Sequence, residues 1–131
     1  MADSTLHVEL VAADRTVWSG EAKTIVARTV EGDIGVLPGH APVLSLLVDG
    51  VVEIDTEDGE TWFAAVEGGF LSIADDRVSI LSEDAQMSHE IDVEQAKADV
   101  EKAKADGLDE AEAQERLARA EAKVRAVEMA G

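Results

Sequence analysis

The sequence predicts an α+β chain, with an amino-terminal antiparallel β-sandwich of about eight to ten short strands and a carboxy-terminal antiparallel two-helix hairpin. Apolar and polar residues alternate from Leu6 to about Ser82, which is the period of strands with one buried face. Turn residues recur at short spacing within this region. After about Met87 the apolar spacing changes to three and four residues, the period of an amphipathic helix. We therefore expect a β-sandwich domain at residues 1–87 and a helical domain at residues 88–131.

The strands are predicted from short alternating runs. In the first run Leu6, Val8 and Leu10 share one face. Further alternating runs lie at 52–54, 62–66 and 78–80. The predicted turns are Ser19-Gly20, Asp49-Gly50, Glu57-Asp58-Gly59, Gly68-Gly69 and Asp75-Asp76. The turn around Asp58-Gly59 is typical of a β-hairpin, and no βαβ unit is expected.

The first helix is predicted from one apolar stripe and a glycine. The stripe consists of Val93, Ala96, Val100 and Ala103. Gly107 suits the left-handed residue just past a helix end, so the helix should stop at about Ala105-Asp106.

The second helix is predicted to begin directly afterwards. Asp109 is a favourable N-cap, Glu112 completes a capping-box pattern, and the chain reaches Met129 without Gly or Pro. Its apolar seam is Ala113, Leu117, Ala120, Val124 and Val127. Three Glu–Arg pairs at i,i+4 spacing should each add only about 0.2–0.5 kcal/mol, namely Glu112–Arg116, Glu115–Arg119 and Glu121–Arg125. The short connection predicts an antiparallel hairpin.

Both helical seams consist mostly of alanine and valine. Burial contributes about 0.8 kcal/mol per methylene, and alanine and valine have few carbons. The two helices should therefore pack closely, but the buried seams should stabilise the hairpin only weakly. The hairpin is therefore expected either to detach from the sandwich or to stay docked on it, and the sequence leaves both possibilities open. The sandwich, which holds Trp18, Trp62, Phe63 and Phe70, should be the independently stable unit.

Composition excludes several function classes. The formal net charge is −18, from 29 acidic and 11 basic residues, so nucleic acid is not an expected partner. The chain has no cysteine, and no apolar run approaches the ~20 residues that span a bilayer, so direct membrane insertion is not expected. His7, His40 and His89 lie apart, without metal-ligand spacing. No phosphate-binding loop or nucleophile-base pattern occurs, so we predict no catalytic residue, metal site or cofactor.

One segment is more distinctive than the rest. Residues 31–42 read EGDIGVLPGHAP, with three glycines and two prolines around a short apolar run, which is typical of a strand between two tight turns. Together with EGGFL at residues 67–71 and the Ala-rich helical tail, this segment resembles the epsilon subunits of F-type ATP synthases. The resemblance covers essentially the whole chain, and the order of the features is more specific than any single motif.

The resemblance implies a non-catalytic central-stalk subunit of a proton-translocating ATP synthase, peripheral on the cytoplasmic face of a bacterial plasma membrane. In that family the sandwich binds the gamma subunit and the ring of c subunits, which makes Glu31 and His40 candidate interface residues. For His40 the residues alone favour a turn role with the ring bonded to local backbone. The helices of the family can extend and contact the catalytic head, holding back ATP hydrolysis. Arg116, Arg119 and Lys123, which also suit weak pairs within the helix, are the candidates for that contact.

Some members of the family bind ATP through a stretch like [IL]DxxRA. This chain has Ile91, Asp92, Gln95 and Ala96 at the matching positions, so glutamine stands where the family has arginine. A cation expected to balance phosphate charge is missing, and we expect weak or absent ATP binding. Two other function classes stay open: a free-standing β-sandwich binding module with a helical tail, and a small nucleotide sensor.

Overall fold

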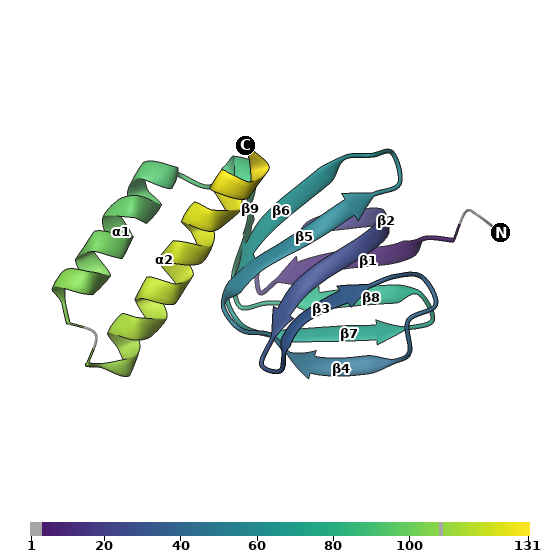
Figure 1. Cartoon of the computed structure of the whole chain (residues 1–131), viewed down its shortest axis with the longest axis horizontal. Helices are drawn as coiled ribbons and strands as arrows, with labels where there is room; N and C mark the ends of the chain where they lie inside the picture. Colours follow the sequence, from purple (N-terminus) through teal and green to yellow (C-terminus); the bar gives the residue numbers. More distant parts are fainter. Residues whose placement is uncertain (1–3, 108) are drawn as a thin grey trace.

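The computed structural model describes residues 4–107 and 109–131, and within them nine strands precede a short 3-10 helix and two α-helices (Figure 1). The strands are β1 (Leu6–Ala12), β2 (Arg15–Thr29), β3 (Gly32–Val36), β4 (Val43–Leu46), β5 (Gly50–Thr56), β6 (Thr61–Val66), β7 (Phe70–Ala74), β8 (Arg77–Leu81) and β9 (Ala85–Met87). The helices are η1 (Ser88–Glu90), α1 (Val93–Ala105) and α2 (Ala111–Ala130). The predicted fold class, a β-sandwich followed by a helical hairpin, is confirmed.

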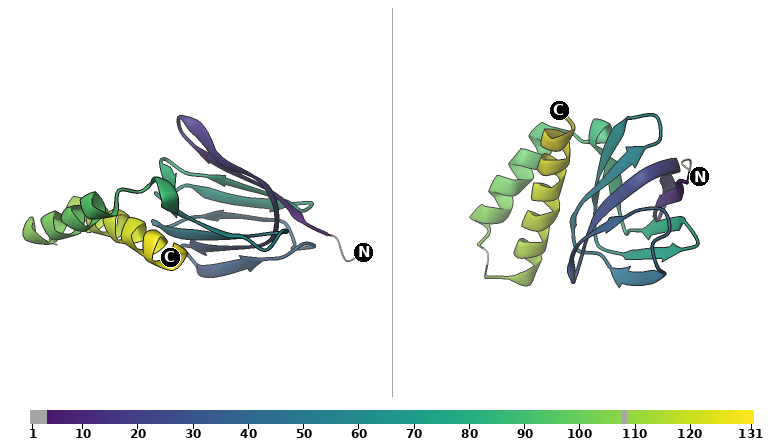
Figure 2. Two further views of the ribbon diagram at one scale, coloured as in Figure 1. Left: turned by 90° about the horizontal axis from the view of Figure 1, so that it is seen from above. Right: turned by 45° about the vertical axis from the view of Figure 1, so that its right-hand side comes forward.

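The strands form one continuous sheet that folds over into the two layers of a sandwich (Figure 2). The order along the sheet is β4-β7-β8-β1-β2-β5-β6-β9, and β3 pairs with β2. The long strand β2 joins the layers, because its first half pairs with β1 while its second half pairs with β3 and β5. The register with β5 shifts between Ala22 and Thr24, where β2 changes partners.

One strand pair departs from the antiparallel arrangement predicted from the sequence. β1 and β8 run parallel, with Val8 opposite Val78 and Leu10 opposite Ile80. No tight turn connects these two strands, so the hairpin geometry that imposes antiparallel pairing on neighbours does not apply to them.

The core between the layers is aliphatic. The largest fully buried side chains are Leu6, Leu10, Ile25, Ile54, Leu71, Ile73, Ile80, Val8, Val36, Val52 and Val78. Trp18 and Trp62 are only partly buried and pack against the edge of this core. Phe70, expected among the large side chains of the sandwich, is 48% exposed. Alternation in the strands therefore predicted the core better than side-chain size did.

The predicted turn at Ser19-Gly20 is wrong, because both residues lie inside β2. The connection between β1 and β2 falls earlier, at Ala13-Asp14. Gly20 is explained by packing, since a Cβ there would lie 2.9 Å from the indole ring of Trp18. The other predicted turns connect strands, and Gly59, Gly68, Gly69, Asp75 and Asp76 all have positive φ.

The first helix matches its prediction, whereas the start of the second does not. α1 ends at Ala105, and Gly107 has a φ of +86°. α2 begins at Ala111 with Glu110 as N-cap, so the prediction of Asp109 as N-cap with a capping box is wrong. The first turn closes where the Gln114 N–H donates to the Glu110 carbonyl oxygen, which shifts the start by one residue. Within the described residues, neither helix is long and apolar enough to cross a membrane.

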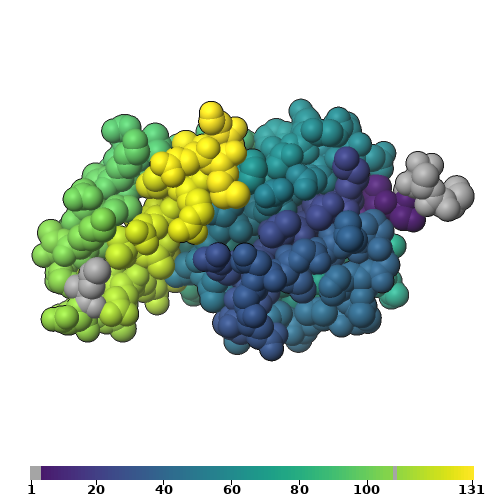
Figure 3. Space-filling model, in the orientation of Figure 1, coloured from purple at the N-terminus to yellow at the C-terminus, as the bar shows by residue number. Residues whose placement is uncertain are grey.

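The helix α2 has two buried faces. Ala113 and Ala120 lie in the predicted seam that faces α1, together with Ala96 and Ala103 of that helix. Ala122 and Ala126 form a second face, which packs on Ala65 of β6 beside Val51, Phe63 and Ile91. α2 thus lies between α1 and the sandwich (Figure 3).

Candidate functional site

The outer face of β4, β7 and β8 carries an exposed row of large apolar side chains. The strand register places Leu46 opposite Phe70, and Phe70 opposite Leu81. Leu46, Phe70 and Leu81 are 50%, 48% and 50% exposed, and Leu44 on the same face of β4 is 74% exposed. We call Leu44, Leu46, Phe70 and Leu81 the apolar row. Contiguous exposed apolar side chains of this kind mark interaction surfaces.

The apolar row was missed at the sequence level, although a signal for it exists. In β4 the half-buried and exposed positions alternate, and the two leucines occupy the exposed positions. A strand whose large apolar residues point outward while Ser45 points inward is a reversed pattern. Such a reversal identifies an interface only after the sheet shows which face is covered.

The two candidate rotor contacts lie at opposite ends of β3. Glu31 is exposed in the turn between β2 and β3, where its N–H donates to Thr29 Oγ1 at 3.1 Å. His40 lies past the other end, half-buried, with its Nδ1 2.7 Å from the Ala41 carbonyl oxygen. The His40 contact is the local backbone interaction that the residues alone favoured. The structure therefore does not bring Glu31 and His40 together.

The three hairpin cations do come together. Arg116, Arg119 and Lys123 line one groove of about 300 Å³ between the helices, with Asp99, Lys102 and Ala120. Arg116 Nη1 lies 3.0 Å from Asp106 Oδ2, so this cation pairs across the hairpin loop instead of with Glu112. Of the three predicted Glu–Arg pairs, the ion pairs among the described residues include Glu115–Arg119 alone.

Arg119 contacts carboxylates from four segments of the chain, and we call these five residues the Arg119 cluster. Its Nε lies 3.5 Å from Asp49, its Nη1 3.3 Å from Glu67, and its Nη2 3.4 Å from Glu83 and 3.3 Å from Glu115. Burial acts to lower the pKa of Arg119, but the surrounding carboxylates outweigh it and raise that pKa. Burial also raises the pKa of Glu67, and the attraction of Arg119 offsets this only in part.

The four residues at the ATP-motif positions have structural partners. Asp92 caps α1 by accepting from the Gln95 N–H at 3.1 Å. The Gln95 side-chain amide donates to Asp99 at 2.9 Å. Ile91 packs beside α2, and Ala96 is buried against the hairpin seam.

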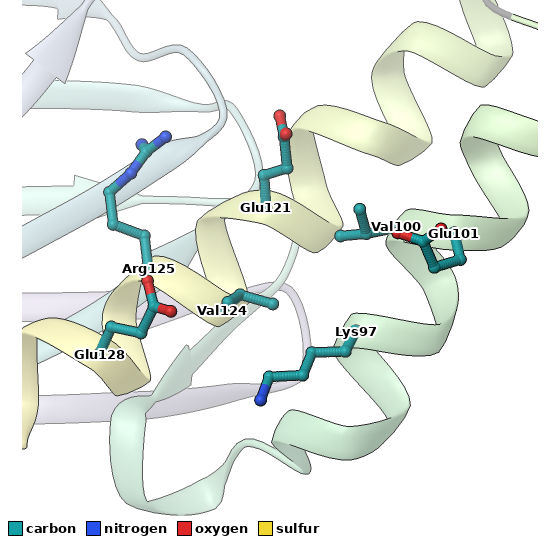
Figure 4. A pocket seen from close by; sticks show the side chains of 7 residues that line it. All are labelled: Lys97, Val100, Glu101, Glu121, Val124, Arg125 and Glu128. Carbon is teal, nitrogen blue, oxygen red and sulfur yellow. The ribbon is translucent and has the colours of Figure 1, made fainter.

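A separate groove of about 300 Å³ lies between the helices, lined by Lys97, Val100, Glu101, Glu121, Val124, Arg125 and Glu128. Figure 4 shows Val100 and Val124 pointing toward each other across it, while Arg125 extends toward the sandwich. Three glutamates and two cations line this groove, so it lacks the positive excess that a polyphosphate requires.

The junction between the sandwich and the hairpin is held by an ion pair that we call the Arg15–Glu90 clamp. Arg15 Nη1 and Nη2 donate to the two carboxylate oxygens of Glu90 at 2.9 and 3.0 Å. Glu90 also accepts from the Met87 N–H at 2.9 Å, and the Arg15 hydrogen bond followed by this one lowers the pKa of Glu90. The rings of His89 and Trp62 meet edge to face at 5.8 Å. The chain is thus tied to the sandwich as far as Glu90.

Comparisons with known proteins agree over both parts of the chain. Residues 5–88 match the family "ATP synthase, Delta/Epsilon chain, beta-sandwich domain". The ATP synthase epsilon chain of Streptomyces avermitilis is 56% identical over 122 residues, covering 93% of this chain and 94% of that protein. The ATP synthase epsilon chain of Rhodococcus opacus is 52% identical over 131 residues, covering 99% and 100%.

Two solved structures share the fold. One chain of the Euglena gracilis mitochondrial ATP synthase OSCP/F1/c-ring assembly aligns with a TM-score of 0.78 and 26% identity, over 97% of this chain and 81% of that one. A chain of the Tetrahymena thermophila mitochondrial ATP synthase central stalk/c-ring aligns with a TM-score of 0.60 and 20% identity, over 95% of each.

Proposed function

The chain belongs to the ATP synthase delta/epsilon chain family, and from this membership we propose that it is a non-catalytic central-stalk subunit of an F-type ATP synthase. In this role it couples ion-driven rotation of the c-ring to ATP synthesis in the catalytic head. The chain works as part of the membrane-bound enzyme, peripherally and on the cytoplasmic side. The similarity to a chain from an OSCP/F1/c-ring assembly supports this proposal.

The observation that carries the proposal is the apolar row. A rotor subunit has to bind its shaft tightly enough to turn with it, and large apolar side chains at the centre of a contact supply most of such binding energy. Leu46, Phe70 and Leu81 form a contiguous stripe on the sandwich face that the hairpin leaves uncovered. We assign this stripe to the gamma subunit, and Glu31 and His40, at opposite ends of β3, to contacts with the c-ring.

The two parts of the chain receive different tasks in this proposal. Residues 1–87 form the rotor-binding domain, and residues 88–131 form a regulatory domain that holds back ATP hydrolysis. The regulatory role requires α2 to leave the sandwich and present Arg116, Arg119 and Lys123 to acidic side chains of the catalytic head. The small side chains at the interface of α2 with the sandwich support such a release.

ATP is not a ligand of the chain in this proposal. Gln95 donates its side-chain amide to Asp99, and no cation stands at its position. Isothermal titration calorimetry of the full chain should therefore detect no binding at ATP concentrations well below millimolar. Saturable binding in that range would overturn this part of the proposal.

The gamma assignment is tested with a double variant, Leu46→Ser with Phe70→Ser. Both residues are half-exposed, so the variant should fold normally, and its affinity for the gamma subunit should fall about 30-fold or more. Leu37→Ser is the matched control, because Leu37 is 60% exposed but lies outside the apolar row. Unchanged gamma binding by the folded double variant would refute the assignment.

The regulatory role is tested with a catalytic head that lacks its own epsilon subunit. Full-length chain and a version truncated after Ile91, which keeps the Arg15–Glu90 clamp, are each added while ATP hydrolysis is measured. Both versions should bind, and only the full chain should slow hydrolysis. Binding without inhibition by the full chain would remove the regulatory role and leave the rotor role standing.

A further inference from the structure

Within the described residues, one cation of the hairpin, Arg119, makes ion pairs with the sandwich. Asp49, Glu67 and Glu83 lie in the loops β4–β5, β6–β7 and β8–β9, at the end of the sandwich that faces α2 (Figure 1). Three loops that are far apart in the sequence thus supply carboxylates to one guanidinium. Among the ion pairs of the described residues, those of Arg119 are the ones that join a helix of the hairpin to the strands and loops of the sandwich.

The contacts of Arg119 with the sandwich are unequal. The side chains of Asp49 and Glu67 are only 16% and 18% exposed, whereas that of Glu83 is 76% exposed. Solvent screens an exposed pair strongly and a largely buried pair much less. The contacts with Asp49 and Glu67 should therefore carry most of the electrostatic attraction, and that with Glu83 little.

The apolar contact beside the Arg119 cluster is small. α2 contributes Ala122 and Ala126, which pack on Ala65 with Val51, Phe63 and Ile91 around them. Each of these alanines buries a single methyl group, so the loss of one ion pair is comparable to the loss of one of these apolar contacts.

We propose that Arg119 is the latch that sets how much of the hairpin is docked, and that the guanidinium must leave Asp49 and Glu67 before α2 can bind another surface. Glu115 lies on α2 and travels with Arg119, whereas the sandwich carboxylates stay behind without their cation. Docking and head binding thus compete for one guanidinium. The inference rests on the proposed regulatory function, because it names the residue that controls the release.

The hinge of this movement lies between two fixed points. The Arg15–Glu90 clamp holds the chain to the sandwich up to Glu90, and α1 begins at Val93. Ile91 and Asp92 are extended, with φ and ψ of −80° and 130° and of −81° and 97°. Rotation about these two residues moves the hairpin while the clamp stays closed.

The first experiment measures docking in the isolated full chain, without any partner. Because the chain has no cysteine, nitroxide labels are introduced at Ser19→Cys on the sandwich and Ala98→Cys on α1, both at exposed positions. Pulsed electron spin resonance then reports the ratio of undocked to docked molecules. Glu67→Gln should raise this ratio about tenfold.

Two controls separate the latch from a general loss of charge. Glu83→Gln removes an exposed carboxylate of the same cluster, and Arg116→Gln removes a cation that pairs with Asp106 inside the hairpin. Each should change the ratio less than about twofold. The pair Glu67→Arg with Arg119→Glu should restore docking that Arg119→Glu alone abolishes. A Glu67→Gln chain that docks like its Glu83→Gln counterpart would overturn the latch.

The second experiment adds the catalytic head and uses the same variants. Glu67→Gln and Arg119→Gln should both raise the undocked population, but Glu67→Gln should strengthen inhibition of ATP hydrolysis while Arg119→Gln should weaken it. Opposite effects on inhibition support the competition, and equal effects refute it. If the full chain never inhibits ATP hydrolysis, the proposed regulatory function is refuted. The docking measurement in the isolated chain still tests whether Arg119 controls docking.

Discussion

The sandwich and the hairpin both show regular apolar patterns, yet they bury side chains of different size. The eleven largest fully buried side chains are leucine, isoleucine and valine, and all lie in strands. Within the described residues, the buried side chains of α1 and α2 are all alanine. Buried positions therefore recur regularly in both parts of the chain, but their burial stabilises the sandwich much more than the hairpin.

The difference bears on the proposed release of the hairpin. Burying a leucine stabilises by about 2 kcal/mol more than burying an alanine, because it removes roughly three more carbons from water. The long strand β2 pairs with strands of both layers and so ties the two layers together. The hairpin continues from the sandwich through Ile91-Asp92, and its buried contacts are made by alanines. We refer to the sandwich as the platform and to the hairpin as the arm.

The largest expected effect comes from Gly69 in the platform. Gly69 has a φ of +103°, and a Cβ there would lie 1.8 Å from the Leu81 carbonyl oxygen. Gly69→Ala should lower the free energy of unfolding by about 4 kcal/mol or more, because the β6–β7 loop must separate from the backbone at the end of β8. Chemical denaturation measures the loss. Gly35→Ala is the control, since Gly35 has open space around its Cβ position.

A core truncation compares the two regions directly. Leu71 is fully buried between the layers, so Leu71→Ala should cost about 3 kcal/mol in the free energy of unfolding. Leu117→Ala on the half-buried seam of α2 should cost about 1 kcal/mol or less. Equal losses in denaturant titrations would break the contrast between platform and arm.

A charge placed under α2 tests whether the arm moves as a unit. Ala126 is fully buried against the sandwich, and Ala126→Glu should be relieved by undocking, at a cost of about 2 kcal/mol. Hydrogen exchange should then show lost protection in α2 and unchanged protection in the strands. Ala130→Glu, at an exposed position one turn further along α2, should leave both patterns intact. Loss of strand protection in the Ala126 variant would mean that the two regions unfold together.

The smallest expected effect is the pH dependence of the junction clamp. The pKa of Glu90 is lower in the folded protein than in the unfolded chain, because its carboxylate accepts from Arg15 and from the Met87 N–H. The stability it contributes is therefore present above the pKa of the unfolded carboxyl group and is lost as the pH falls through the lower, folded pKa. Glu90→Gln should reduce stability slightly at neutral pH and remove part of this acid sensitivity. Unchanged acid sensitivity of the variant in thermal melts at pH 3 to 7 would contradict the assignment.

Sequence patterns predicted helices, strands and turns well where a residue is required by its neighbours along the chain. The alternation of Leu6, Val8 and Leu10 marked buried positions correctly, and Gly107 marked the end of α1. The turn assigned to Ser19-Gly20 failed because Gly20 serves the packing of the Trp18 ring rather than a change of chain direction. Glycine can be required by a local change of chain direction or by the packing of a nearby side chain. The sequence does not distinguish these two reasons.

The candidate sites were predicted less completely than the fold. Arg119 was identified from its spacing with Arg116 and Lys123, but its partners Asp49, Glu67 and Glu83 lie 36 or more residues away in three loops. The apolar row depends on strands that pair across the sequence, and the second face of α2 depends on Ala65 in β6. None of these groupings has a fixed spacing along the chain.

The sequence by itself determined the period of each segment, the turns at Asp58-Gly59, Gly68-Gly69 and Asp75-Asp76, and the change from strands to helices. These features depend on φ, ψ preferences and on neighbours within about four residues, which one-dimensional order contains. Only the tertiary structure decided the parallel pairing of β1 with β8, the exposure of Phe70 and the four carboxylates around Arg119. Those features depend on contacts between distant segments, because ion pairing and burial follow distances in space rather than separation along the chain.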